Sequence, residues 1–377
     1  MTTDKPLSLL CISGATSGST GLYVRISDPP GAIVVEGLPI TPLESDPSLL
    51  HYSVLTLCNR IHSRVVSKYG SHGSDCLVTF GLSSTTTGGA LEQLVSAADH
   101  GGFGRLSPEK VSWITRGEAC YYAAGLDSDA IVAKTGTVAF AHGISAARSG
   151  PRVMHRVGGW GLMSGDDGGA YHIGRSVLFR LFQEQDGRAD RTEFSDQMER
   201  LMGSGFDIPS LVSWIRRQRI EQALRVEVSE LARVAIYLAE EKHDKFCMDL
   251  LWHAARHVGV SCRVAASRLK SLDEMFGMNG IDVVLHGRLI KHSPMFATYV
   301  LASIGKELEE AGFGNIRFIP LQVRPILGCL MFTLRERLRY SIADSTSIGA
   351  QLKQSLASQL GDEFGSGVLA AFARGDK

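Results

Sequence analysis

Short apolar runs alternate with polar, glycine-rich turns at the start of the chain. Residues 7–12, 22–26 and 32–36 are mostly apolar, and residues 14–21 are mostly glycine, serine and threonine. Runs of this length, bounded by small polar residues, are typical of buried strands. We therefore predict a strand, a polar hairpin turn and two returning strands.

The strand pattern returns after a helical stretch. The elements predicted next are a helix at residues 47–69, a strand at 76–80, a helix from 90, a strand at 111–115, a helix at 118–124 and strands at 130–133 and 138–141. The last two strands again enclose a turn of small residues. Because both halves open in this way, the pattern indicates an internal duplication.

Helical periodicity dominates the region from residue 168 to about residue 264. The elements predicted after residue 168 are helices at residues 170–185, 193–202, 208–236, 243–258, 294–311, 326–338 and 349–360, and strands at 281–285 and 316–319. This mixture of strands and helices predicts an α/β fold.

Length and charge narrow the class of protein. A chain of 377 residues exceeds the size at which one core stops growing, so we expect two domains. Basic and acidic residues balance at 39 each, so nucleic acid is not an expected partner. The apolar run at residues 325–334 falls well short of the roughly 20 residues of a membrane span, so no membrane partner is expected. Seven scattered cysteines favour reduced, buried thiols and a cytoplasmic location.

The densest motif is GGWGLMSGDDGGAYHIGR at residues 158–175. Its glycines permit tight turns and close backbone approach, and two carboxylates stand just before a predicted helix. The motif resembles the GGWGxxxGDEGSxxxIG signature of the N-acetylglucosamine kinase and activator-ATPase-like family, within the actin and sugar-kinase superfamily. The resemblance implies substrate binding by Gly158, Gly159, Trp160 and Asp166. Asp167 and Gly169 replace the glutamate and serine of the family.

Residues 133–137, with the sequence AKTGT, resemble the hairpin with which the family binds the terminal phosphates of a nucleotide. The resemblance assigns Thr135, Gly136 and Thr137 to phosphate binding. Lys134 replaces a glycine of the family. Either the turn geometry differs, or a cation lies near the phosphates, or the lysine points to solvent.

Two further matches concern catalysis. Glu118 follows a predicted strand where the family has its catalytic aspartate, so the resemblance implies that Glu118 is the general base. The family begins with a glycine-rich loop whose aspartate organises a magnesium ion, and this chain has Ser13 there. Gly14, Thr16 and Ser17 are expected to bind phosphate, with ATP as donor and the role of Mg²⁺ open.

Weaker matches complete the expected site. Gly287 and Arg288 follow a predicted strand where the family passes beside adenosine, and Arg288 either binds the nucleotide or is solvated. Ser83 and Ser84 lie where the family approaches its sugar, or they cap the next helix. We expect no metal site on the protein, since His253 and His257 stand four residues apart without a third ligand.

The resemblance implies a two-lobed, duplicated actin/ribonuclease-H-like α/β fold with an interlobe cleft. The predicted lobes are residues 1–125 and 126–340, and residues 341–377 form a helix and tail that pack on the first lobe. The predicted activity is ATP-dependent phosphotransfer to a hydroxyl of an amino sugar similar to N-acetylglucosamine, by an enzyme that could form a homodimer. The alternative is a catalytically impaired homologue that binds sugar or nucleotide as a sensor.

Overall fold

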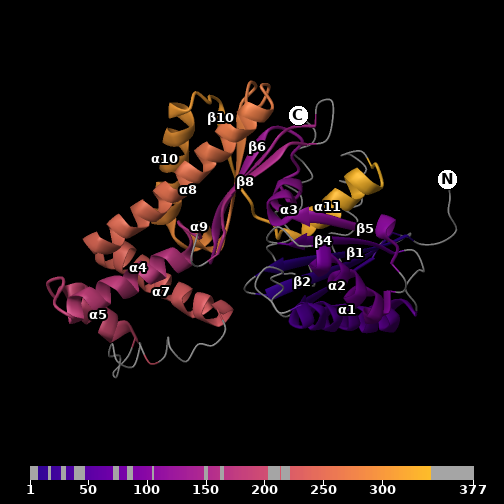
Figure 1. Cartoon of the computed structure of the whole chain (residues 1–377), viewed down its shortest axis with the longest axis horizontal. Coiled ribbons are helices and arrows are strands. Elements are labelled where there is room, and N and C mark those ends of the chain that lie inside the picture. The colour runs from indigo at the N-terminus through magenta and orange to yellow at the C-terminus, as the bar shows by residue number, and fades with distance from the viewer. Residues whose placement is uncertain are drawn as a thin grey trace. The chain divides into compact units, whose positions relative to one another are not determined.

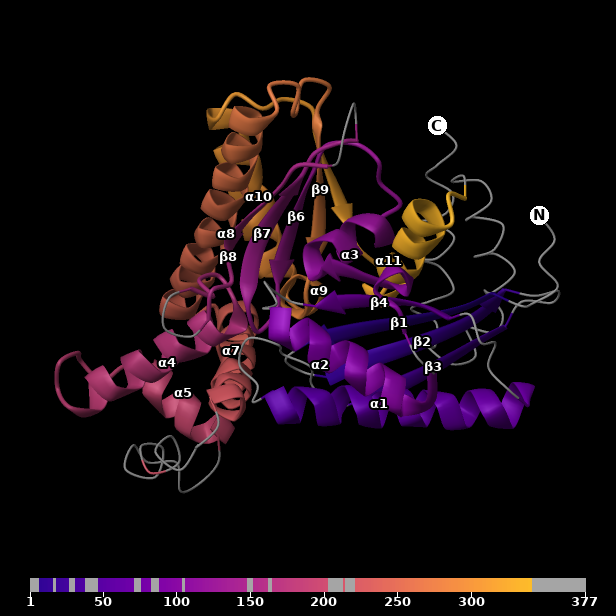
Figure 2. The same ribbon diagram turned by 45° about the vertical axis from the view of Figure 1, so that its right-hand side comes forward.

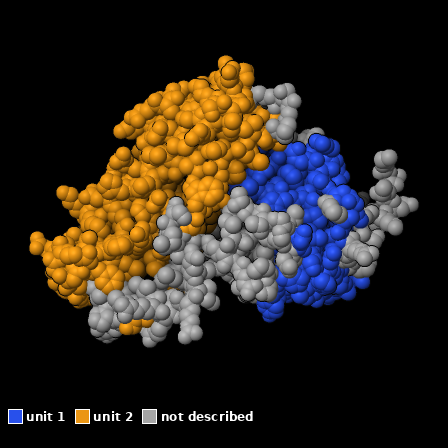
Figure 3. All heavy atoms as spheres, viewed as in Figure 1, with its two compact units in different colours: residues 1–127, 321–377 blue, residues 128–320 orange. Residues whose placement is uncertain are grey.

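The chain divides into two compact units (Figure 3). Unit 1 comprises Met1–Asp127 and Leu321–Lys377, and unit 2 comprises Ser128–Pro320. The structure is a computed structural model, which describes residues 7–15, 18–26, 31–37, 47–70, 76–82, 88–103, 106–147, 152–161, 165–202, 213 and 221–340. The helix predicted at residues 349–360 lies outside the described residues.

Unit 1 contains a five-stranded mixed sheet with the strand order β3-β2-β1-β4-β5 (Figure 1). The first three strands pair antiparallel, and β4 and β5 continue the sheet parallel to β1. The strands are β1 (Leu7–Ala15), β2 (Gly18–Ile26), β3 (Gly31–Gly37), β4 (Cys76–Leu82) and β5 (Val111–Thr115). The apolar runs of the sequence are therefore the strands that we predicted; β1 and β4 contribute mostly buried residues, whereas Ile114 is the buried residue of β5.

Helices cover both faces of this sheet (Figure 2). One face packs on α1 (Pro47–Tyr69) and α2 (Gly88–Ala98), whose apolar residues share a core with β1 and β4. The other face contacts α3 (Arg116–Ala123) and α11 (Ile326–Phe332). There, the Thr79 hydroxyl of β4 lies 2.7 Å from the hydroxyl of Thr333.

A close backbone contact joins α11 to α3. A Cβ atom added to Gly328 would lie 1.6 Å from the carbonyl oxygen of Ala119, so the two helices approach through a glycine. The segment after α11, residues 333–337, continues the contact, because the Tyr122 hydroxyl donates to Glu336 at 2.9 Å. We had placed this segment in the second lobe, but in the structure it belongs to unit 1. A helical period reveals an apolar face without revealing which sheet the face covers.

Unit 2 repeats the arrangement of unit 1. The strand order is β10-β9-β6-β7-β8, in which β6, β7 and β8 pair antiparallel while β9 and β10 extend the sheet parallel to β6. The strands are β6 (Ala130–Thr135), β7 (Ala139–Ile144), β8 (Met154–Gly158), β9 (Ile281–His286) and β10 (Ile316–Pro320). The predicted duplicated α/β fold class is thereby confirmed.

The helices of unit 2 pack on this sheet and on one another (Figures 1 and 2). They are α4 (Ala170–Gln185), α5 (Glu193–Met202), α7 (Glu221–Lys242), α8 (Lys245–Leu272), α9 (Arg288–His292) and α10 (Pro294–Glu310). Gly259 lets α8 approach α10, since a Cβ there would lie 2.2 Å from the Ser303 hydroxyl oxygen. Helix α8 extends well beyond residue 258, where we expected it to end. No helix of the described residues is both long and apolar enough to cross a bilayer.

All seven cysteines are buried, and none of them forms a disulfide bond. Burial raises the pKa of Cys76 to about 12, and burial is also the main reason why the pKa of Cys329 rises to about 12. These two thiols therefore stay protonated at neutral pH, as the scattered cysteine pattern led us to expect.

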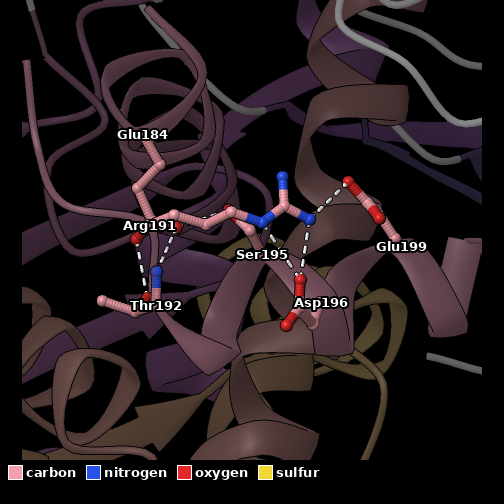
Figure 4. Close-up of polar contacts among 6 residues, drawn as sticks. All are labelled: Glu184, Arg191, Thr192, Ser195, Asp196 and Glu199. Carbon is pink, nitrogen blue, oxygen red and sulfur yellow. Dashed lines mark hydrogen bonds and ion pairs between the residues drawn. The ribbon is translucent and has the colours of Figure 1, made fainter. Parts of the chain in front are cut away.

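A buried carboxylate holds the connection between α4 and α5 (Figure 4). Glu184 accepts hydrogen bonds from the Ser195 hydroxyl at 2.5 Å, from the Thr192 hydroxyl at 2.8 Å and amide at 3.1 Å, and from Arg180 at 2.6 Å. Burial raises the pKa of Glu184, but the bonds from Ser195, Thr192 and Arg180 outweigh it, and the net pKa is lowered. The ionised carboxylate therefore stabilises the turn.

We predict that Glu184→Gln lowers the free energy of unfolding by about 2 kcal/mol or more, because an amide cannot accept all four hydrogen bonds. The contribution of the carboxylate is complete above the unfolded-state pKa of about 4.3 and disappears as the pH falls through the lower folded-state pKa. Urea denaturation at pH 7 and in acid measures the free energy of unfolding of both proteins. The difference between variant and wild type should be smaller in acid than at pH 7. Glu199→Gln, at an exposed ion pair with Arg191, is the control and should change little.

Candidate functional site

The turn between β6 and β7 lies at one edge of the unit 2 sheet. Strands β6 and β9 are parallel with Lys134 opposite His286, so Thr135 and Gly287 follow at the same edge. Gly287 adopts a φ of 144°, and a Cβ atom there would lie 1.9 Å from the Thr135 carbonyl oxygen. Two of the predicted phosphate-binding segments therefore meet, and only glycine permits the contact.

Main-chain hydrogen bonds join this turn to the start of α4. The Ala170 amide donates to the Gly136 carbonyl at 2.8 Å, and the Tyr171 amide donates to the Thr137 carbonyl at 3.2 Å. The Gly169 amide donates to the Asp166 carbonyl at 3.0 Å. A Cβ at Gly169 would lie 2.6 Å from the Thr137 carbonyl oxygen, so a glycine permits this close approach.

The side chains of the turn are buried. Thr135 is completely inaccessible, and its hydroxyl oxygen has no hydrogen-bond partner among the described residues. Thr137 is also buried. Burying a hydroxyl without a hydrogen bond costs about 1–3 kcal/mol. A hydrogen bond from a bound ligand to the Thr135 hydroxyl would remove this cost.

Lys134 extends along the turn. Its ammonium nitrogen lies 3.7 Å from the position that a Cβ of Gly136 would occupy, and 5.3 Å from the ring centroid of Phe140. The side chain is half-buried. The ammonium group therefore lies beside the turn, and the role of this lysine stays a prediction.

The glycine-rich loop after β8 has an unusual backbone. Gly158, Gly159, Gly161 and Asp166 all have positive φ, at 78°, 73°, 107° and 66°. The two residues to which we assigned sugar contacts differ sharply in exposure, since Trp160 is 52% exposed and Asp166 is 1% exposed. The loop therefore presents an aromatic ring and encloses a carboxylate.

Arg156 on β8 organises this loop, and the sequence interpretation missed it. Its guanidinium donates to the carbonyls of Gly158 at 3.1 Å and Gly159 at 2.6 Å. Burial lowers the pKa of Arg156, while the Asp166 carboxylate acts in the opposite sense. An arginine two residues before a glycine pair is the only signal that the sequence offered.

His172 is a second residue that the sequence interpretation missed. Its Nδ1 atom accepts a hydrogen bond from the Gly168 amide at 3.1 Å, and its ring packs edge-on against His257 at 5.2 Å. Burial and then the neighbouring His257 lower the pKa of His172, so the imidazole is neutral and can accept this bond at pH 7. Within the described ranges, no three histidine, cysteine, aspartate or glutamate side chains are placed to hold a metal ion.

In unit 1, parallel strands bring the other predicted residues to one sheet edge. Ser13 pairs with Gly81, and Gly81 pairs with Ile114, so β1, β4 and β5 end together. Ser13 is buried, and Gly14 follows it in β1. Thr16, Ser17, Ser83 and Ser84 lie outside the described residues.

Glu118 has a structural role in the first turn of α3. Its carboxylate accepts a hydrogen bond from the Thr115 amide at 2.6 Å, and the Thr115 hydroxyl accepts one from the Glu118 amide at 3.1 Å. This reciprocal pair is a capping box. The carboxylate that we assigned as the general base therefore also caps the N-terminus of α3.

Comparison with known proteins rests on structure alone. No protein-family model matches the sequence, and no curated protein matches it significantly. A candidate N-acetylglucosamine kinase from Chromobacterium violaceum superposes with a TM-score of 0.60 at 17% identity, over 86% of this chain and 98% of that one. A second candidate N-acetylglucosamine kinase, from Porphyromonas gingivalis, gives 0.57 at 11% identity, over 89% and 100%.

This chain has the fold of those two proteins. The resemblance that we identified from the sequence is thereby confirmed for the fold. Unit 2 brings together the turn at Thr135, the glycine at 287 and the loop that carries Asp166. Arg288 starts a helix of five residues and is exposed. The roles of these residues stay predictions.

We predict that Gly287→Ala lowers the free energy of unfolding by about 1–3 kcal/mol, because its Cβ would overlap the Thr135 carbonyl and push the turn away. Gly312→Ala is the matched control. Gly312 also has positive φ, at 80°, but nothing lies within 4 Å of its Cβ position. Urea denaturation, with hydrogen exchange of residues 130–144, measures the effect. Equal losses in both variants would mean that backbone strain alone matters.

Proposed function

We propose that this chain is an ATP-dependent kinase that phosphorylates a hydroxyl of an amino sugar similar to N-acetylglucosamine. The observation that carries the proposal is the direct main-chain connection between the turn at Thr135–Thr137 and the loop that holds Asp166. A phosphate donor and a polyhydroxy acceptor need adjoining sites, and this connection supplies two adjoining polar segments. The fold shared with two candidate N-acetylglucosamine kinases supports the same reading.

The phosphates of ATP would bind at the turn. We propose that Thr135, Gly136 and Thr137 offer amides and hydroxyls to the phosphate oxygens, with the unmet Thr135 hydroxyl as one donor. The Lys134 ammonium beside the turn would offset their negative charge. In unit 1, we assign Gly14, Thr16 and Ser17 to the same role.

The nucleoside and the sugar would occupy neighbouring positions. Gly287 would let the chain pass beside adenosine, with exposed Arg288 free to stack or to pair with phosphate. The exposed ring of Trp160 would pack on the sugar, and Asp166 would accept hydrogen bonds from its hydroxyls. We propose Gly158 and Gly159 as the close backbone of this subsite and Ser83 and Ser84 as further contacts.

Glu118 would act as general base. The acceptor oxygen forms a bond to the γ-phosphorus as the bond from that phosphorus to the bridging oxygen of ADP breaks, and the hydroxyl proton passes to the Glu118 carboxylate. The proposal requires the Glu118 carboxylate to combine proton transfer with its bond to the Thr115 amide.

The described residues do not fit the magnesium anchor of the family. The end of β1 carries the buried hydroxyl of Ser13 in place of a carboxylate, and hydroxyls neutralise no charge. We therefore derive no step through magnesium.

A sensor that binds sugar or nucleotide without turnover is the second candidate. Two observations favour it: the Glu118 carboxylate already accepts a helix-start amide at 2.6 Å, and Ser13 supplies no charge. Isothermal titration with ATP, with and without magnesium, and an ADP-release assay over a panel of amino sugars separate the two. Release of ADP that depends on one amino sugar supports the kinase, and binding without release supports the sensor.

We predict that Glu118→Gln lowers kcat about 100-fold or more and leaves the affinity for ATP nearly unchanged, because glutamine cannot accept the proton. Glutamine can still cap the helix, so stability should hold. Glu118→Ala removes both functions and should also lose about 1 kcal/mol of stability. A glutamine variant with undiminished kcat would remove Glu118 from the mechanism.

Ser13→Asp should make nucleotide binding depend more strongly on magnesium, because it restores a carboxylate at the strand end. We expect the ratio of ATP affinities with and without magnesium to rise about tenfold. Isothermal titration measures this ratio, and Ser13→Asn, of the same size without charge, is the control. An unchanged ratio in the aspartate variant would show that this position does not contact the metal ion.

A further inference from the structure

The loop that follows β8 needs an external support. Gly158, Gly159 and Gly161 all adopt positive φ, a conformation that glycine tolerates but does not prefer over others. Within the loop, the Gly165 amide donates to the Gly161 carbonyl at 3.0 Å. This bond closes the loop without fixing the direction in which Trp160 leaves the strand.

Arg156 supplies this support through two consecutive carbonyls. Its Nε atom donates to Gly158 and its Nη2 atom donates to Gly159, so the planar guanidinium grips the backbone at two successive residues. A Cβ at Gly159 would lie 2.5 Å from the same Nη2 atom. The glycine pair and the arginine therefore fit each other. A lysine has three N–H donors but only one nitrogen, so it lacks the two separate nitrogens with which the planar guanidinium reaches the two carbonyls.

The same guanidinium contacts two aromatic rings. Its carbon lies 4.9 Å from the Phe140 ring centroid and 5.1 Å from the Trp160 ring centroid. Phe140 belongs to β7, next to the turn between β6 and β7, whereas Trp160 belongs to the loop after β8. Cation–π contacts of this kind contribute about 0.5–2 kcal/mol, so Arg156 holds an exposed tryptophan against the sheet.

Asp166 faces the same charge. The Asp166 carboxylate is buried and interacts electrostatically with Arg156, where it opposes the fall that burial causes in the pKa of the guanidinium. Arg156 therefore contacts the Trp160 ring and interacts with the Asp166 carboxylate from β8.

We infer that Arg156 is a positioning residue that holds Trp160 and Asp166 in the arrangement that binds the sugar. This inference rests on the proposed kinase function for its ligand, but the arrangement of the loop can be tested without turnover. Arg156 would act through the loop and would not contact the reacting atoms.

The test compares Arg156→Lys and Arg156→Met with the control Arg188→Lys, which alters an exposed arginine paired with Asp186. We expect faster hydrogen exchange of residues 158–168 in the methionine variant, a smaller change in the lysine variant and none in the control. Acrylamide quenching of Trp160, obtained by subtracting the matching Trp160→Phe protein, should change in the same order. Circular dichroism checks that each variant is folded.

With a sugar that the wild type phosphorylates, Arg156→Met should raise the KM for that sugar roughly tenfold or more and change the KM for ATP by less than about twofold. The KM for the sugar in Arg156→Lys should lie between those of the wild type and the methionine variant. Unchanged exchange and quenching in a folded methionine variant would overturn the inference. If no amino sugar is turned over by the wild type, the kinase proposal fails, while exchange and quenching still decide the role of Arg156. An equal rise in the KM for the sugar and the KM for ATP would also overturn the inference about Arg156.

Discussion

The arrangement of unit 2 depends on one set of main-chain contacts, in which the first amides of α4 donate to the carbonyls of the β6–β7 turn. These bonds satisfy helix-start amides that would otherwise lack partners, and they fix the helix to the sheet edge. The contact is possible because Gly169 carries no side chain at its closest approach to the turn, and Gly287 in the same way lets the end of β9 approach Thr135. The contact between α4 and the β6–β7 turn therefore joins the segment with Thr135 to the segment with Asp166.

The two units share a strand order but differ in the chemistry at corresponding sheet edges. In unit 1, β1 carries the uncharged Ser13 near its end, and the Glu118 carboxylate is engaged in a helix cap. In unit 2, Lys134 lies beside the hairpin turn and Arg156 lies beneath the following loop. The two units therefore share a scaffold and differ in the side chains at these edges.

Several elements were predictable because their signals are local. The apolar runs at β1, β6 and β9 and the periodicity of α4 gave the correct element types. Strand β8 was missed because Met154 and Val157 are its only apolar residues apart from Gly158. Its side chains are also partly exposed. The length of α8 was underestimated, since Gly259 looks like a helix end although it serves the contact with α10.

Apolar spacing and glycine placement predicted most of the elements, the duplication and the glycine-rich loop with Trp160 and Asp166, because these signals act on neighbouring residues. The packing of whole elements placed α11 in unit 1 and brought the Arg156 guanidinium against the loop. These contacts depend on how whole elements pack. Side chains distant in the chain, or directed by a particular turn, meet only after the backbone has reached its final path.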